Sequence, residues 1–155
     1  MTRAKISLIE QRVIEAQAIV PLIIAFGEKV GLEQAIAIVQ RNNEETSREY
    51  GRRCAANLGS NSMSDLISEV ASWGEGGVLE EVVLERDERT YAFNVTGCLY
   101  AERYDALGVR EFGYCLSCCR DNPFVEGFNP KIKFKRTQTI MEGAPYCDFR
   151  YTLED

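Results

Sequence analysis

The 155-residue sequence contains no histidine, and this absence removes several kinds of catalytic chemistry. Without an imidazole there is no Ser-His-Asp triad, no Cys-His pair and no metal site with histidine ligands. An excess of basic residues is lacking as well, because 18 Lys and Arg stand against 24 Asp and Glu for a net charge of −6. A general nucleic-acid-binding protein needs a basic face to displace counterions from phosphates, so we expect no nucleic-acid partner.

Long hydrophobic runs are also missing. The longest, Ala18 to Phe26, spans nine residues and contains Pro21, whereas a bilayer-spanning helix needs about 20. The first five residues carry two positive charges, but Glu10, Arg12 and Glu15 interrupt the apolar stretch that follows, unlike in a signal peptide. We therefore expect no membrane segment, no signal peptide and a cytoplasmic location.

Residues 1–155 are expected to form a single domain, since 45% apolar and 27% charged residues is an ordinary globular balance. Residues 1–75 form a helical half. Apolar residues recur at three- and four-residue spacing over 6–20, which predicts an amphipathic helix. Pro21 then either lies in the first turn of a second helical segment over 22–30 or marks a kink. Further helices are predicted over 32–59 and after a cap at Ser64. The Ile- and Val-rich surface of these helices suits contact with another copy, so a homo-oligomer through the N-terminal helices is one expectation.

The second half, residues 78–153, has a different pattern with alternating apolar and polar residues. The predicted elements are strands over 78–85 and 90–96, helices over 98–107 and 111–121, and strands over 131–140 and 147–153. The fold class is therefore α+β, with N-terminal helices followed by an antiparallel sheet of about four strands and two inserted helices.

Cysteine is the residue type most open to a chemical role, because six are present and a cytoplasmic protein keeps them reduced. Cys115, Cys118 and Cys119 form a Cys-x-x-Cys-Cys cluster, which is typical of zinc, iron–sulfur or redox sites. A zinc ribbon needs a second close pair, however, and the other three cysteines are isolated in the sequence. We therefore expect no cofactor, with bound zinc or iron as the alternative. For the cysteines themselves, the alternative to a chemical role is that they are small buried core residues.

Asp121 follows Cys118 by three residues, about one helical turn, so the two side chains can face the same space. A neighbouring carboxylate raises the pKa of a thiol, so the pair is useful only if Asp121 accepts the thiol proton, if a cation offsets its charge, or if it binds the substrate. The structural alternative is a helix-end aspartate before Asn122 and Pro123.

Arg136 is the second unusual residue. Strand alternation places it on the same face as Ile132, Phe134 and Ile140, so it is expected to point inward. A buried guanidinium needs acceptors, which either a substrate carboxylate or a structural salt bridge would provide; a bulge that turns it outward is the third alternative.

Cys98 follows Gly97 at the expected junction between a strand and a helix. The partial positive charge of a helix N-terminus lowers the pKa of a thiol and favours the nucleophilic thiolate. By this local criterion Cys98 is the best activated of the six cysteines, the alternative being a small residue packed at a tight junction.

Residues 78–153 contain an ordered set of short motifs. They are Gly97-Cys98, Cys118-Cys119-Arg120-Asp121, Glu126-Gly127-Phe128-Asn129-Pro130, Arg136-Thr137-Gln138-Thr139 and Cys147-Asp148-Phe149. Taken together, this half of the chain resembles the L-2-amino-thiazoline-4-carboxylic acid hydrolase family, whose namesake activity opens a thiazoline ring to give N-carbamoyl-L-cysteine.

The resemblance implies a hydrolase of a small, carboxylate-bearing cyclic compound with C–N and C–S bonds. By position it points to Cys98, Cys118 and Asp121 as catalytic residues and to four substrate-binding residues: Asn129, Arg136, Thr137 and Cys147. It implies a small-molecule substrate and no metal ligand. The alternative function is a non-catalytic small-molecule or metal-binding module with a thiol-lined pocket.

Overall fold

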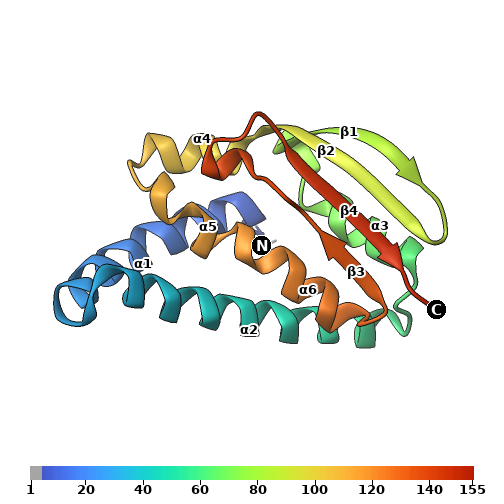
Figure 1. Cartoon of the computed structure of the whole chain (residues 1–155), viewed down its shortest axis with the longest axis horizontal. Helices are drawn as coiled ribbons and strands as arrows, with labels where there is room; N and C mark the ends of the chain where they lie inside the picture. Colours follow the sequence, from blue (N-terminus) through green and yellow to red (C-terminus); the bar gives the residue numbers. More distant parts are fainter. Residues whose placement is uncertain (1–4) are drawn as a thin grey trace.

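The computed structural model describes residues 5–155 (Figure 1); residues 1–4, on which part of the signal-peptide expectation rests, lie outside the described residues. The N-terminal half begins with two long helices, α1 (Leu8–Val30) and α2 (Leu32–Leu58). Ser7 caps α1 through a reciprocal capping box with Glu10, and Gly59 ends α2 in a left-handed conformation with φ of 66°. Pro21 lies inside α1, so residues 22–30 belong to this helix and the alternative of a separate second helix is wrong.

The remaining elements alternate between helices and strands. They are α3 (Met63–Ser72), η1 (Glu75–Gly77), β1 (Leu79–Arg86), β2 (Thr90–Cys98), α4 (Leu99–Ala106), η2 (Arg110–Phe112), α5 (Gly113–Leu116), η3 (Cys118–Arg120), α6 (Asp121–Phe128), β3 (Ile132–Lys135), η4 (Ile140–Glu142) and β4 (Cys147–Leu153). Ser62 caps α3 with a capping box to Asp65, in place of the predicted Ser64. The α+β class and the four antiparallel strands are as predicted.

The four strands are ordered β1-β2-β4-β3, so the C-terminal strand lies inside the sheet. Phe93 of β2 pairs with Phe149 of β4, and their stacked rings have centroids 4.8 Å apart. Tyr91 and Tyr151 form the next inward pair of the same ladder. Such aromatic cross-strand pairs stabilise the ladder and fix its register.

Two hydrophobic clusters fill the interior. One lies between the sheet, α3 and α6, and the other packs α1 and α2 against α4 and α5. Cys98 touches both clusters, while Cys118 belongs to the second and Cys147 to the first. These three cysteines therefore lie where the two clusters meet.

Helix α6 packs backbone to backbone against α2 (Figure 1). A Cβ added at Gly127 would lie 1.9 Å from the Arg48 carbonyl oxygen, and one at Gly51 would lie 2.1 Å from the Phe124 oxygen. Both positions therefore require glycine. This close contact fixes α6, and with it Asp121 at the helix start, against the N-terminal half.

Two predicted elements are wrong. The expected helix over 111–121 is broken into η2, α5 and η3, and α6 begins at Asp121, where that helix was expected to end. Pro123 lies in the first turn of α6, where its missing N–H removes no helical hydrogen bond. The expected strand over 131–140 is confined to β3, so Arg136 follows the strand and Ile140 lies in η4.

The surface around the α1–α2 connection is apolar. Leu22, Ile24, Phe26, Val30 and Leu32 each expose 45% to 61% of their area. A homo-oligomer through these helices remains a prediction. None of the helices described has the combination of length and apolar character that crossing a membrane requires.

Candidate functional site

Cys98 ends β2 and is the N-cap residue of α4, the junction that the sequence predicts. Its expected activation is wrong, because burial raises the pKa of the Cys98 thiol above its ordinary value. Hydrogen bonds from the backbone N–H groups of Ala101 and Tyr100 oppose this rise, whereas the charges of Asp121 and Glu102 add to it. Desolvation therefore outweighs the helix N-terminus, and the resting residue is a thiol.

Cys118 and Asp121 come from the broken segment between α5 and α6. Cys118 begins η3 and Asp121 begins α6, which keeps the pair three residues apart in continuous helical turns. Burial raises the pKa of Cys118 well above its ordinary value, and the neighbouring Asp121 carboxylate raises it further. The pKa of Asp121 is also raised by burial, although Arg136 opposes the shift.

Arg136 points inward as predicted and connects these residues. Its Nη1 donates to Asp121 Oδ2, and its Nη2 donates to the Cys118 carbonyl oxygen at 2.9 Å. The guanidinium carbon lies 5.4 Å and 5.0 Å from the ring centroids of Phe134 and Phe149. The side chains of Arg136 and Asp121 are only 6% and 19% exposed, so this is a buried ion pair.

Cys147 begins β4, and its sulfur accepts a hydrogen bond from the Ile140 N–H at 3.1 Å. Burial raises its pKa, and the charges of Arg136, Cys98 and Asp121 also act on this thiol. Cys98 and Cys147 in turn both act on Cys118. The thiols of residues 98, 118 and 147 thus lie within electrostatic reach of one another and of the Asp121–Arg136 ion pair.

Asn129 and Thr137 do not join this group. Asn129 lies eight residues, roughly 12 Å along the helix, from Asp121. Its Nδ2 donates to the Asn61 carbonyl at 2.8 Å, which ties the end of α6 to the start of α3. Thr137 is exposed and donates from Oγ1 to Asp148 Oδ2 at 2.6 Å. Both side chains therefore serve loop contacts.

Cys115 and Cys119, the other members of the cysteine cluster, are buried core thiols. Cys115 Sγ donates to the Phe112 carbonyl and Cys119 Sγ donates to the Cys115 carbonyl, at 3.2 and 3.1 Å. Burial raises their pKa values to about 11 and about 12. Within residues 5–155, no group of three or more His, Cys, Asp or Glu side chains is arranged to hold a metal ion.

A surface cavity of about 720 Å³ lies beside the buried group. It is lined by Arg110, Glu111, Tyr114, Met141, Glu142 and Gly143. Tyr114 connects this cavity to the buried group, because it lines the cavity and also interacts with Arg136. Burial raises the pKa of the Tyr114 hydroxyl, and the charge and hydrogen bond of Arg136 oppose this rise. The lining does not include Cys98, Cys118 or Asp121.

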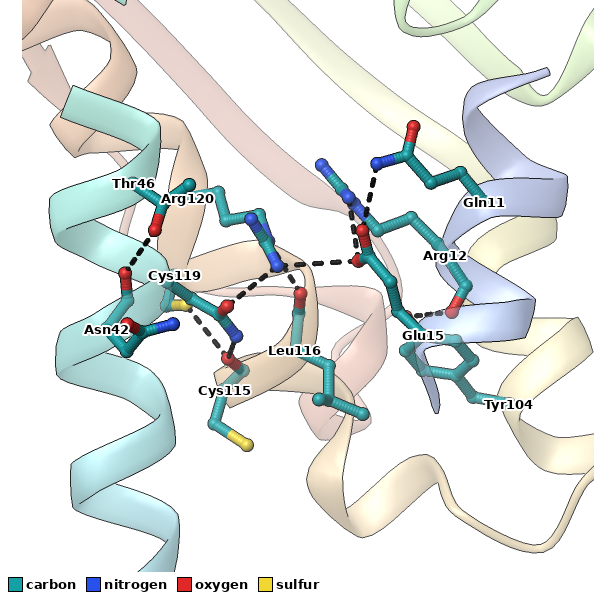
Figure 2. Close-up of polar contacts among 11 residues, drawn as sticks. Gln11, Arg12, Glu15, Asn42, Thr46, Tyr104, Cys115, Leu116, Cys119 and Arg120 are labelled. Atoms are coloured by element: carbon teal, nitrogen blue, oxygen red, sulfur yellow. Dashed lines mark hydrogen bonds and ion pairs between the residues drawn. The ribbon is translucent and has the colours of Figure 1, made fainter. Parts of the chain in front are cut away.

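Sequence reasoning missed a second charged group, formed by Arg12 and Glu15 of α1 and Arg120 of η3 (Figure 2). Arg12 was treated only as an interruption of an apolar stretch. It precedes the fully buried Ala16 by four residues, so it lies on the inner face of α1. That spacing is the signal from which an inward arginine was predictable.

A model of the L-2-amino-thiazoline-4-carboxylic acid hydrolase family matches residues 11–151. The chain belongs to this family. The match extends through α1 and α2, so the likeness to L-2-amino-thiazoline-4-carboxylic acid hydrolases is not limited to the second half.

Among curated proteins, none matches this chain. Among solved structures, trafficking protein particle complex subunit 3 from Naegleria fowleri, covalently bound to palmitic acid, is similar at 14% identity with a TM-score of 0.45. The likeness covers 86% of this chain and 93% of that one. A likeness at this level supports no conclusion about function.

Proposed function

We propose that the protein hydrolyses a small, carboxylate-bearing cyclic compound of the 2-amino-thiazoline-4-carboxylate type, with Cys98, Cys118 and Asp121 at the reacting centre. The observation that carries this proposal is the meeting of three thiols, one carboxylate and one guanidinium at the junction of the two hydrophobic clusters. Membership of the family supports the substrate class. All six cysteines are free, which supports a reducing compartment such as the cytoplasm.

The reaction needs a nucleophile and a proton acceptor, and neither has to be histidine. The Cys98 sulfur adds to the ring carbon between sulfur and nitrogen while Asp121 accepts the thiol proton. The ring C–S bond then breaks, and the released sulfur takes up a proton. Water adds to the same carbon and expels the Cys98 sulfur, which regains a proton. The product is N-carbamoyl-L-cysteine, the substrate plus one water.

Cys98 is the better nucleophile of the two catalytic thiols. It is partly exposed, and two backbone N–H groups stabilise its thiolate. Cys118 lies directly beside the Asp121 carboxylate, whose charge disfavours a second anion. We therefore assign the attack to Cys98, and we give Cys118 and Cys147 no covalent role.

Arg136 acts as a positioning residue for Asp121. Its Nη1 and Nη2 atoms are bonded to Asp121 and to the Cys118 carbonyl, and two aromatic rings lie close to its guanidinium. Burial raises the pKa of Asp121, which favours uptake of a proton by this carboxylate, the step that a general base performs. The cavity that Tyr114 lines opens to solvent, and we propose that the substrate enters there.

The test is steady-state turnover of 2-amino-thiazoline-4-carboxylate, followed by formation of N-carbamoyl-L-cysteine. Cys98→Ala and Asp121→Asn are expected to lower kcat by about 100-fold or more, the usual contribution of a nucleophile or general base. Cys54→Ala is the matched control, because Cys54 is a partly buried thiol on α2 outside this group. Full activity of Cys98→Ala would refute the assignment, and binding without turnover in the wild type would favour a non-catalytic binding module.

A further inference from the structure

Strand β1 is an unprotected edge of the sheet. It is the outermost strand in the order β1-β2-β4-β3, so β2 pairs with one side of it and the other side has no strand partner among residues 5–155 (Figure 1). The strand is eight residues long, and Val82, Val83 and Leu84 expose 51%, 50% and 55% of their area. A long apolar edge with unpaired backbone N–H and C=O groups is a template for another strand.

The opposite edge of the same sheet is protected against such pairing. Strand β3 has only four residues, and Lys133 and Lys135 are exposed on it. Short edge strands and exposed lysines both oppose the addition of another strand. The sequence of β1, Leu79–Arg86, contains neither lysine nor proline. β1 therefore lacks the side-chain protection that β3 has.

The register with β2 shows which side chains of β1 share a face. Three residues of β1 lie opposite residues of β2 that are buried in the cluster beneath the sheet; the pairs are Glu81–Val95, Val83–Phe93 and Arg86–Tyr91. Residues directly opposite each other lie on the same face, so these three lie on the inner face. Leu84 is the extra residue of a bulge, because Val83 and Glu85 pair with consecutive residues of β2. Glu81 and Arg86 are therefore each two pairing positions from Val83, on opposite sides of it.

This spacing makes β1 complementary to a second copy of itself. When two β1 strands pair antiparallel about a twofold axis at Val83, Glu81 of each copy lies opposite Arg86 of the other. Directly opposite residues have Cβ atoms about 4.5–5.5 Å apart, which is close enough for an ion pair. The symmetric contact therefore contains two ion pairs, one on each side of the central pair of valines.

The charged groups that meet in this arrangement have no partner within one chain. Neither Glu81 nor Arg86 takes part in an ion pair in the part of the chain that the structure describes. Glu81 Oε1 is also buried without a hydrogen-bond partner. Burial raises the pKa of the Glu81 carboxyl, because its charged form is poorly compensated. A second copy supplies the cation that this carboxylate lacks.

We propose that β1 is a dimer interface, at which it pairs antiparallel with β1 of a second copy about Val83 and joins the two four-stranded sheets into one. A second copy is the occupant that fits, because the strand carries both signs of charge at matching distances from its centre. This contact is separate from the one predicted for the N-terminal helices, and it does not depend on the proposed hydrolysis.

The first test is the mass of the protein in solution, measured by light scattering after size exclusion over a series of concentrations. The wild type should approach the mass of two chains, whereas Val83→Lys should stay at the mass of one, because it places two like charges at the twofold axis. Phe26→Lys is the matched control and should dimerise like the wild type, since Phe26 is 61% exposed on α1. Loss of the dimer in Phe26→Lys would assign the contact to the N-terminal helices and overturn the proposal. A monomeric wild type would also overturn it, leaving a strand of another protein as the occupant, and so would a Val83→Lys variant that dimerises.

Charge exchange tests the register of the two strands. Arg86→Glu should weaken the dimer about 10-fold or more, because it places two carboxylates opposite each other on each side of the axis. Adding Glu81→Arg to this variant restores opposite charges in the reverse order, so the double variant should recover most of the lost affinity. A double variant that folds and is as weak as Arg86→Glu would overturn the proposal.

A crosslinking test keeps the inference falsifiable if a charge variant fails to fold. After oxidation by copper–phenanthroline, Val83→Cys should form a disulfide between the substituted positions of two copies, because these positions meet at the axis. Glu85→Cys is the control and should form no such disulfide, since position 85 lies opposite Val82 of the other copy. Mass spectrometry of the digested dimer identifies the linked peptides. No link in Val83→Cys, or equal linking at both positions, would overturn the proposal.

Discussion

The ion pair between Asp121 and Arg136 should be strongly coupled energetically, and a double-mutant cycle measures this directly. Removing one partner of a buried pair costs about 3–5 kcal/mol, because an unpaired charge remains inside. The 19% exposure of Asp121 lets water relieve part of that penalty, so we expect roughly 2–3 kcal/mol for either Asp121→Asn or Arg136→Met. The double variant has no unpaired charge from this pair, so it should lose less stability than the two single variants added together. We expect this difference, the coupling energy, to be about 1–2 kcal/mol.

The assay is urea unfolding followed by the fluorescence of Trp73, the single tryptophan. Trp73 packs edge-on against Phe124 with ring centroids 5.3 Å apart, so it reports on the cluster between the sheet and α6. The Arg48–Glu126 pair is the matched control, because it joins α2 to α6 with 31% and 45% exposure and should couple by less than about 0.5 kcal/mol. Equal coupling in the two pairs would refute the view that Asp121 and Arg136 form a buried unit.

Two further predictions concern stability. Burial raises the pKa of Cys115 from 9.0 to about 11, so the folded protein holds this proton more tightly than the unfolded chain, and the stabilisation present below pH 9 is lost as the pH rises towards 11. Cys115 alone should lower the free energy of unfolding by about 1.4 kcal/mol by pH 10. Urea unfolding of the reduced protein at pH 8 and pH 10 measures this loss. If a Cys115→Ala variant loses as much stability between these pH values as the wild type, Cys115 is not its origin. Gly127→Ala should destabilise the protein by about 3 kcal/mol, because its Cβ meets the Arg48 backbone and α6 must move away from α2. Gly27→Ala, inside α1, is the comparison, because its added Cβ would lie 3.2 Å from Leu32 and should change stability by less than about 1 kcal/mol. Similar effects of the two substitutions would show that α6 and α2 are not in tight contact.

The elements with a clear local pattern were predictable from the sequence. The strand over 147–153 matches β4, since alternation with a buried face on one side is a local property. The long helix over 32–59 matches α2 and ends at Gly59, where a left-handed residue closes it. Arg136 was correctly expected to point inward even though β3 ends one residue before it.

Residues 110–128 were not predictable in the same way. Asn122 and Pro123 indicate the end of a helix, but here they lie in the first turn of α6, a position that proline also tolerates. The contact of Gly127 with the backbone of α2 at Arg48 decides whether Asn122 and Pro123 end a helix or begin one. Arg48 lies some 79 residues earlier in the sequence, so local patterns carry no information about this contact.

The position of part of the candidate site was predictable, but its electrostatics were not, and Asn129 and Thr137 make loop contacts elsewhere. Cys98, Cys118, Asp121 and Arg136 were all singled out, and they do meet. The direction of the Cys98 pKa shift was wrong because local reasoning sees the helix N-terminus and does not see how deeply the thiol is buried. Arg12 was overlooked because its partners on η3 and α4 become neighbours only after α1 packs.

The most direct test of the proposed chemistry is mass spectrometry of the acid-quenched protein after mixing with 2-amino-thiazoline-4-carboxylate. Attack by Cys98 predicts an adduct of one substrate mass on the peptide that contains Cys98, formed before N-carbamoyl-L-cysteine accumulates, and absent from Cys98→Ala. Product formation by Cys98→Ala at the wild-type rate, or no product with the wild-type protein, would contradict the account.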